Sequence, residues 1–303
     1  MERAKGNMEI LSLTNVSKTY NDSTKALIDI SLSVKRGEIV GVIGRNGAGK
    51  STMFKILCGL IEDYEGKSLI FGEKSSIKLS ERISYLPEVR GLDSRRYVLE
   101  HLVELVMYKG ISKKCATVEV EKWLKEFSLY DRRYSKISAL SKGNQQRVQL
   151  IVAIASKPEV LILDEPFSGL DLITIDYFWK ILLKLREEGC TIIFSTHDLN
   201  DNMLLCDKFV FLDKGKLEKR GSLEEIQNSF PVVLELKNIS VKKEDIVTVA
   251  GEENVQRKND EYYIRLNDES DARTIFDGLS EKYSEKFYVR KMNISEIFRE
   301  ISG

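Results

Sequence analysis

The chain has 303 residues, of which 42% are hydrophobic and 31% charged, and its 47 basic side chains balance its 47 acidic ones. This length can bury a sizeable core and can form one large domain or a large and a small one. The balanced charge argues against a protein that holds nucleic acid by its phosphates, so we expect no nucleic-acid partner.

The sequence gives no sign of a membrane span or an export signal. Its apolar runs fall far short of the ~20 residues that cross a bilayer. The N-terminal residues 1–7 are polar and lead into no signal-peptide core, so we expect a cytoplasmic chain. Cys58, Cys115, Cys190 and Cys206 are scattered without zinc-binding spacing, and we interpret them as ordinary core or surface residues.

The first three quarters of the chain alternate predicted strands and helices. Alternating apolar and polar residues predict half-buried antiparallel strands at Glu9–Leu13 and Leu27–Val34. Continuous aliphatic runs predict strands covered on both faces of a parallel sheet at Glu38–Ile43, Val160–Leu163 and Thr191–Phe194. Helical patterns lie among them, at Val98–Lys109, Val118–Phe127, Gly143–Ser156 and Ile175–Glu188. This order indicates an α/β core.

The pattern changes at Pro231, where we predict a domain boundary. Beyond it the sequence predicts short strands at Val232–Leu236, Ile246–Ala250 and Tyr262–Leu266, with helical and mixed segments after them. We therefore expect one domain over residues 1–230 and a small α+β domain over residues 231–303. About 70 residues are marginal as an independent fold.

A glycine-rich segment, Gly44–Ser51, follows the buried strand at Glu38–Ile43 and precedes a helical run. This is the context of a P-loop, in which backbone N–H groups close around phosphate and the helix dipole faces the anion. Lys50 is placed to reach the β- and γ-phosphates, and the Ser51 hydroxyl to bind Mg²⁺. The alternative is a strand-to-helix turn without a ligand.

Two acidic residues follow the predicted strand at Val160–Leu163. A P-loop enzyme needs a second carboxylate directed at Mg²⁺, and Asp164 can supply it. Glu165 can orient the attacking water or accept its proton. His197 follows the strand at Thr191–Phe194 and therefore lies at the carboxyl edge of the sheet, where its side chain can hydrogen-bond a phosphate or the water.

Several motifs in a fixed order resemble those of the ATP-binding subunits of ABC transporters. They are the P-loop at 44–52, Leu-Ser-Lys-Gly-Asn-Gln-Gln-Arg at 140–147, Leu-Asp-Glu-Pro-Phe-Ser-Gly-Leu-Asp at 163–171, and Ser-Thr-His-Asp at 195–198. The resemblance covers residues 8 to about 228. It implies a P-loop core of ABC type with an antiparallel β layer and a helical insertion at about residues 81–155.

The resemblance implies ATP and Mg²⁺ as cofactors and a head-to-tail dimer, of two like or two different subunits, that holds two ATP molecules. In it Ser141–Gln145 caps the γ-phosphate of the ATP on the partner's P-loop, and Tyr20 stacks on adenine. Glu165 and Lys50 act in catalysis with His197, the switch histidine, and the metal ligands are Ser51, Glu88 and Asp164. The nucleotide contacts are Tyr20, Gly44, Arg45, Asn46, Gly47, Ala48, Gly49, Lys50, Ser51, Thr52, Ser141, Lys142, Gly143, Asn144, Gln145 and Asp171.

Two motifs depart from the family pattern. Lys142 and Asn144 replace a glycine and a glutamine of the signature, while Ser141 and Gly143 are retained. Lys142 can either add positive charge near the phosphates or point to solvent. Glu88 stands where the family carries a glutamine that senses Mg²⁺ and water, and a carboxylate remains a competent ligand for that ion.

These variants and the C-terminal tail resemble the NatA-like branch of exporter ATPases. The resemblance implies a permease partner that docks near Val89–Tyr97, a segment with Arg90, Arg95 and Arg96, and a peripheral location on the inner face of the cell membrane. For the tail we prefer a stability or dimer-contact role over ligand sensing. The sequence leaves three alternatives: an import ATPase, an ABC-type ATPase acting on ribosomes or DNA, and a regulatory subunit that binds ATP without hydrolysing it.

Overall fold

The chain folds into two compact units, Met1–Arg220 and Gly221–Gly303. The second unit begins upstream of the boundary predicted at Pro231, because helix α6 (Leu223–Gln227) is tied to it: the Gln227 side-chain amide donates to the Met292 carbonyl at 2.8 Å. The computed structural model describes residues 8–89, 91–197, 199, 201–237, 243–259, 261–278 and 286–302.

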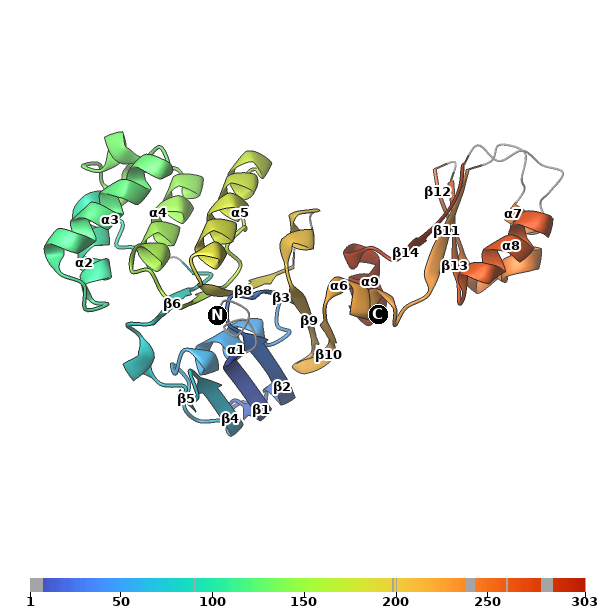
Figure 1. Ribbon diagram of the computed structural model, residues 1–303, viewed down its shortest axis with the longest axis horizontal. Helices are drawn as coiled ribbons and strands as arrows, with labels where there is room; N and C mark the ends of the chain where they lie inside the picture. The colour runs from blue at the N-terminus through green and yellow to red at the C-terminus, as the bar shows by residue number, and fades with distance from the viewer. Residues whose placement is uncertain are drawn as a thin grey trace, which may run out of the picture. The chain divides into compact units, whose positions relative to one another are not determined.

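The N-terminal unit has two sheets and a set of helices (Figure 1). Its strands are β1 (Glu9–Thr19), β2 (Lys25–Lys35), β3 (Ile39–Ile43), β4 (Glu65–Ile70), β5 (Glu73–Lys74), β6 (Ile83–Leu86), β7 (Val160–Leu163), β8 (Thr191–Thr196), β9 (Lys208–Asp213) and β10 (Lys216–Gly221). Its helices are α1 (Lys50–Leu57), α2 (Val98–Met107), α3 (Lys113–Glu126), α4 (Lys142–Ala155) and α5 (Leu172–Glu187).

The two sheets differ in strand direction. One has the order β2-β1-β4-β5 and is antiparallel, which is the β layer expected from the alternating pattern. The other has the order β10-β9-β3-β8-β7-β6, and the strands from β9 to β6 run parallel. The central strands of the parallel sheet are buried at every position, as expected for strands covered on both faces.

Different elements cover the two faces of the parallel sheet. Helix α1 packs Met53 and Phe54 between the antiparallel sheet and Val40, Val42 and neighbouring residues of the parallel one. Helices α2 to α5 lie on the other side (Figure 1). There, Trp179 of α5 meets the ring of Phe194 edge-on at 5.4 Å. This layering confirms the predicted α/β core and leaves the carboxyl ends of the parallel strands together at one edge.

The helical insertion begins later than expected. Strand β6 falls inside the predicted range of about 81–155, yet it pairs with β7 in register Ile83↔Val160 and so belongs to the sheet. The helices of this region run from Val98, where α2 begins, to Ala155 at the end of α4.

The C-terminal unit forms a four-stranded antiparallel sheet in the order β12-β13-β11-β14. Its strands are β11 (Val232–Lys237), β12 (Val255–Lys258), β13 (Glu261–Leu266) and β14 (Lys286–Lys291), and its further helices are α7 (Lys243–Ala250), α8 (Glu269–Gly278) and α9 (Ile294–Ser302). Helices α7 and α8 pack on one face, where Leu234, Ile264 and Ile275 are buried. This β-α-β-β-α-β arrangement is the α+β fold expected for the tail.

One predicted strand of the tail is wrong. Residues 246–250 are β-branched and alternate in part, yet they form the last turns of α7. Ile246, Val247 and Ala250 all pack against the sheet, and the spacing i, i+1, i+4 places them on one helix face. Tertiary packing therefore outweighs the strand propensity of this run.

None of the helices in the described parts of the chain is long and apolar enough to cross a bilayer. All four cysteines are free thiols: Cys58 and Cys190 are buried, Cys206 is half-buried and Cys115 is exposed.

Candidate nucleotide-binding site

The loop between β3 and α1 forms a tight cradle that depends on glycine. Gly47 and Gly49 have φ angles of 83° and 105°, in the left-handed region that side chains rarely adopt. A Cβ on Gly49 would lie 2.4 Å from the carbonyl oxygen of Ala26, so no other residue fits there. Helix α1 begins immediately afterwards at Lys50, and its first N–H groups carry the positive end of the helix dipole.

Lys50 lies folded back into this cradle. Its ammonium donates to the carbonyl oxygens of Gly44 at 2.7 Å and Arg45 at 3.3 Å. Oε1 of Glu165 lies 3.2 Å from the same nitrogen, yet it accepts no well-directed hydrogen bond in the described structure. Both side chains are only 6% exposed. The buried Lys50 ammonium and Glu165 carboxylate are thus in contact, but among the described residues Oε1 of the carboxylate is left without a hydrogen bond.

Asp164 and Glu165 follow β7 at the carboxyl edge of the parallel sheet. The Asp164 Oδ1 atom accepts a hydrogen bond of 2.6 Å from the Ser195 hydroxyl. Glu165 has a φ of 51°, a conformation that costs a side-chain-bearing residue about 1 kcal/mol or more. Its Oε2 lies 2.9 Å from Nδ1 of His197, and since a carboxylate only accepts, that nitrogen carries the proton. The structure therefore brings Lys50, Glu165 and His197 into one chain of contacts.

A cavity of about 480 Å³ joins the P-loop to these carboxylates. Its lining comprises Tyr20, Thr24, Lys25, Ala26, Asn46, Gly47, Ala48, Gly49, Lys50, Ser51, Thr52, Glu88, Asp164 and Glu165. All three predicted metal ligands are among them. Gly44 and Arg45 are connected to the cavity through Lys50, which donates to their carbonyl oxygens. His197 is connected to it through its contact with Glu165.

Tyr20 marks the outer end of this cavity. The residue is 39% exposed, and its hydroxyl lies 3.2 Å from the Thr52 hydroxyl. The Lys18 ammonium is 5.3 Å from the ring centroid. An exposed aromatic face beside a phosphate cradle suits stacking on a base.

The signature segment lies outside this cavity. Ser141 caps α4 by accepting from the Asn144 backbone N–H at 3.3 Å, and the Gln145 side-chain amide donates to Ile137 and Leu140 carbonyl oxygens. A Cβ on Gly143 would meet nothing within 4 Å, and Lys142 is exposed. Among the described residues, neither this segment nor Asp171 lines the cavity of the chain's own P-loop.

Asp171 caps the next helix, α5. Its carboxylate accepts from the backbone N–H of Thr174 at 2.9 Å and from the Thr174 hydroxyl at 3.0 Å. The backbone N–H, followed by that hydroxyl, lowers the pKa of Asp171 below its ordinary value. Arg147 in turn donates to the Thr174 hydroxyl, which links this loop to α4.

Three residues near the site have no role predicted from the sequence. Ser195 bonds Asp164, Tyr85 of β6 places its hydroxyl 3.4 Å from Asp164 Oδ2, and Gln149 of α4 donates to the Pro87 carbonyl beside Glu88. Burial, followed by the Asp164 charge, raises the pKa of Tyr85 and keeps it a donor. The available signals were a serine and a tyrosine ending buried strands and a buried glutamine on an apolar helix face.

The residues present fit a nucleoside triphosphate with Mg²⁺. Gly47 and Gly49 permit the positive φ angles of the cradle, and the lining groups Ser51, Glu88 and Asp164 offer the hard oxygen ligands that Mg²⁺ prefers. A P-loop opening a helix, a strand-end aspartate and glutamate, and a histidine on that glutamate together define an ATP-hydrolysing P-loop protein.

Comparison with known proteins gives the particular family. Residues 27–168 match the family described as "ABC transporter". The chain is 35% identical over 299 residues to YhaQ of Bacillus subtilis, an uncharacterized ABC transporter ATP-binding protein, covering 97% of this chain and 99% of YhaQ. It is 30% identical to the ABC transporter ATP-binding protein NatA of the same organism, covering 73% of this chain and 92% of NatA. The chain belongs to the ATP-binding proteins of ABC transporters, an ATPase family.

A solved structure matches the N-terminal part of the fold. The dimeric ATP-binding cassette MJ0796, captured after hydrolysis with ADP and Pi, superposes with a TM-score of 0.65 at 28% identity, covering 71% of this chain and 99% of MJ0796. The resemblance inferred from the sequence motifs is thus confirmed. Asp198 of the Ser-Thr-His-Asp motif and Arg90 of the predicted docking segment lie outside the described residues.

Proposed function

We propose that this chain is the ATPase subunit of a membrane exporter, and that it works as a dimer closed around two ATP molecules. The observation that carries the proposal is the cavity that joins the Gly44–Ser51 cradle to Asp164 and Glu165. Binding energy of the closed dimer would move the permease, and hydrolysis would reopen the dimer.

The contacts of Lys50 suggest how ATP starts the cycle. Phosphate oxygens entering the cradle would compete with Glu165 for the Lys50 ammonium, which now lies 3.2 Å from that carboxylate. Released from Lys50 and still bonded to His197, Glu165 would then orient the attacking water and accept its proton. Mg²⁺ bound with the nucleotide would be held by Ser51 and Asp164, with Glu88 nearby, and would neutralise phosphate charge.

The position of the signature segment supports a dimer. Ser141–Gln145 starts helix α4, so its N–H groups form an anion-binding end, but it does not line the chain's own described cavity. The open space at Gly143 leaves room for close approach by another molecule's phosphate. We assign this segment, with Asp171, to the ATP held by a second subunit, which can be a like or a different chain.

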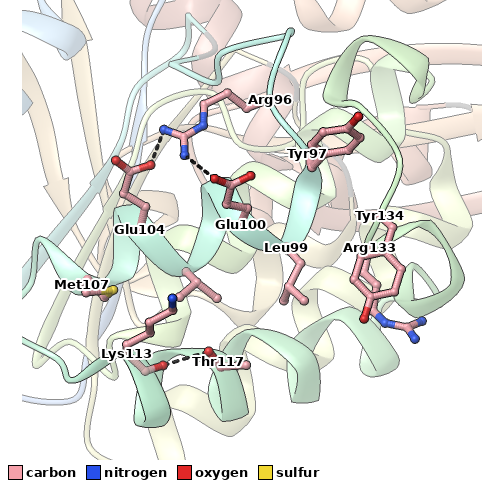
Figure 2. Close-up of a pocket in the computed structure, with 11 residues that line it drawn as sticks. Arg96, Tyr97, Leu99, Glu100, Glu104, Met107, Lys113, Thr117, Arg133 and Tyr134 are labelled. Carbon is pink, nitrogen blue, oxygen red and sulfur yellow. Dashed lines mark hydrogen bonds and ion pairs between the residues drawn. The ribbon is translucent and has the colours of Figure 1, made fainter.

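A groove on the helical insertion supports the docking of a permease (Figure 2). Its volume is about 580 Å³. It is lined by Arg96, Tyr97, Leu99, Glu100, Val103, Glu104, Met107, Lys113, Thr117, Arg133 and Tyr134. Of the described residues in the predicted docking segment Val89–Tyr97, only Arg96 and Tyr97 line the groove, while Arg95 pairs with Asp93.

The chemistry of this groove suits a short amphipathic helix of the permease. Tyr97 and Tyr134 are 48% and 66% exposed, and Leu99, Val103 and Met107 add apolar side chains to the lining. Arg96 pairs with Glu100 and Glu104 along one rim. An apolar groove with a charged rim accepts an apolar helix face and fixes its orientation. Docking there would hold the chain at the inner face of the membrane.

The export direction rests on the resemblance of the Leu-Ser-Lys-Gly-Asn signature and of the C-terminal unit to NatA-like exporters. YhaQ aligns with 97% of this chain and thus shares the length of that tail. An import ATPase, and an ATPase that acts on ribosomes or DNA, are the outcomes against which the proposal is tested.

The test is affinity purification of the chain from its native membranes, followed by mass spectrometry. We expect a multi-span membrane protein of exporter type to be recovered, and to be lost in the double variant Tyr97→Ala, Tyr134→Ala. The matched control is Tyr108→Ala, Tyr288→Ala, which removes two other exposed tyrosines that do not line the groove.

The control variant should retain the permease. Recovery of ribosomal or DNA-processing proteins alone would overturn the transport assignment, and recovery with a solute-binding receptor would overturn the export direction. Equal loss of the permease from both double variants would overturn the groove assignment.

A further inference from the structure

The carboxylate of Asp164 is held from both sides by hydroxyl groups. The side chain is 2% exposed, and it lies between strands β8 and β6, the two neighbours of β7 in the sheet. Ser195 of β8 donates to Oδ1 at 2.6 Å, and Tyr85 of β6 lies 3.4 Å from Oδ2. The shorter of the two bonds is in the range of a charge-assisted O–H···O⁻ bond.

Ser195 also contacts the backbone of Glu165, the residue that follows Asp164. Its hydroxyl oxygen accepts a hydrogen bond of 2.9 Å from the backbone N–H of Glu165. That residue has the left-handed φ of 51°, so this bond helps to stabilise a strained conformation. Ser195 itself is fully buried, so water cannot substitute for it readily.

The direction of these bonds is fixed by the number of protons. A serine hydroxyl carries one proton, and an ionised carboxylate can only accept. The proton of Ser195 therefore points to Asp164, and its lone pair receives the Glu165 N–H. The Ser195 hydroxyl thus connects the Asp164 carboxylate with the backbone N–H of Glu165, the proposed catalytic carboxylate. On the other side, Oδ2 of Asp164 has, among the described residues, only the weaker Tyr85 contact and can accept further bonds.

We propose that Ser195 is a positioning residue of the hydrolysis reaction, which holds the Asp164 carboxylate and the Glu165 backbone in one fixed relation, with Tyr85 as a weaker second restraint. The proposal rests on the proposed function, in which Asp164 binds the metal and Glu165 directs water. Partners of this kind orient metal ligands, and their loss costs about 10- to 100-fold in metal affinity.

The experiment measures Mn²⁺ binding to the full-length protein with ADP by electron paramagnetic resonance, which reports on the metal without turnover. Ser195→Ala should raise the dissociation constant of Mn²⁺ about 10-fold, and Ser195→Thr, which keeps a hydroxyl, should restore most of the affinity. Tyr85→Phe should raise the constant by about 3-fold or less, because its 3.4 Å contact is long.

The matched control is Thr191→Val at the opposite end of β8. Thr191 is also fully buried, and its hydroxyl accepts from the Gly37 N–H. Its loss should lower the melting temperature and leave Mn²⁺ affinity unchanged. In ATPase assays Ser195→Ala should lower kcat more than it changes KM for ATP at saturating Mg²⁺, which a loss of stability alone would not do.

Asp164→Asn distinguishes a failure of the Ser195 proposal from a failure of the proposed function on which it rests. If Asp164→Asn removes Mn²⁺ binding while Ser195→Ala binds like the unaltered protein, the role of Ser195 is overturned and the proposed function stands. If Asp164→Asn binds Mn²⁺ normally, the metal assignment of the proposed function fails and the role of Ser195 fails with it. Equal weakening by Thr191→Val and Ser195→Ala would reduce Ser195 to a structural residue.

Discussion

A charged cavity lies in each of the two units, and the two differ in how their charges are satisfied. The cavity of the C-terminal unit, about 600 Å³, has Arg290 in its lining. Arg290 donates to Glu235 at 2.7 Å and to both carboxylate oxygens of Glu296 at 2.7 and 2.8 Å. Nearby, Arg265 pairs with Glu300. These opposite charges bind one another.

The nucleotide cavity is arranged differently. Lys50 directs its hydrogen bonds to backbone carbonyl oxygens, while Oε1 of the adjacent Glu165 lacks one in the described structure. The backbone at Glu165 is strained, and the cradle beside it consists of glycines with positive φ. Buried charges that lack complete partners cost free energy, which a bound ligand can return.

The number of charged residues around a cavity therefore does not identify a ligand site. Both cavities contain arginine or lysine with glutamate, and the C-terminal one is the larger. Incomplete hydrogen bonding and backbone strain distinguish the nucleotide cavity. We therefore expect substitutions in the nucleotide cavity to change function and substitutions in the cavity of the C-terminal unit to change stability.

The largest effect is expected for Lys50→Ala. In the proposed site Lys50 would supply positive charge for the phosphates, so its removal should abolish binding of a fluorescent ATP analogue. Arg290→Met is the control in the other cavity and should bind the analogue normally. Full nucleotide affinity in Lys50→Ala would refute the P-loop assignment.

Glu165→Gln should separate binding from hydrolysis. The amide cannot accept a proton from water, so turnover should fall by ~10²-fold or more, the scale of lost general-base catalysis. Binding of the ATP analogue should persist, because the P-loop is unchanged. Steady-state phosphate release measures the effect, with Glu159→Gln as a control: that carboxylate pairs with Arg36 and Arg82 away from the cavity. A variant at position 165 with normal turnover would assign the base elsewhere.

Local sequence patterns point to the candidate nucleotide site more readily than to the packing around it. Gly44–Ser51, Asp164 and Glu165 could be identified because glycine spacing and strand-end carboxylates are local signals. The bonds from Ser195 and Tyr85 to Asp164 join neighbouring strands that lie far apart in the chain. Such contacts depend on strand order, which local pattern does not encode.

The errors in the predicted fold have the same physical origin. Residues 246–250 form a helix because three of them share one face against a sheet, and strand propensity is overridden by that packing. Strand β6 was included in the helical insertion because only its pairing with β7 assigns it to the sheet. Layer order could be predicted from strand patterns, whereas pairing and unit boundaries required tertiary contacts.

The smallest of these effects, but the sharpest test of the comparison, is Arg290→Met. It leaves Glu235 and Glu296, 12% and 22% exposed, without their cation, and should lower the free energy of unfolding by about 2–3 kcal/mol. Urea unfolding of the full chain measures it. The control is Arg265→Met, whose pair with Glu300 is 37% and 36% exposed and should contribute less than about 1 kcal/mol.

The pH dependence of the same variant tests the cause. Burial alone would raise the pKa of Glu296, but hydrogen bonds from Arg290 and the Asn293 backbone lower it below its ordinary value of 4.5. A carboxyl whose pKa is lowered by folding stabilises the fold above the unfolded value, and that contribution is lost as pH falls through the folded value. The stability difference between the unaltered protein and Arg290→Met should therefore be largest near pH ~7 and shrink as pH falls, first because the unpaired Glu296 of the variant takes up a proton and then because the paired Glu296 of the unaltered protein does so. A difference that stays the same down to pH 3 would show that Arg290 acts by packing its aliphatic stem, and the contrast between the two cavities would then rest on hydrogen bonding in the nucleotide site alone.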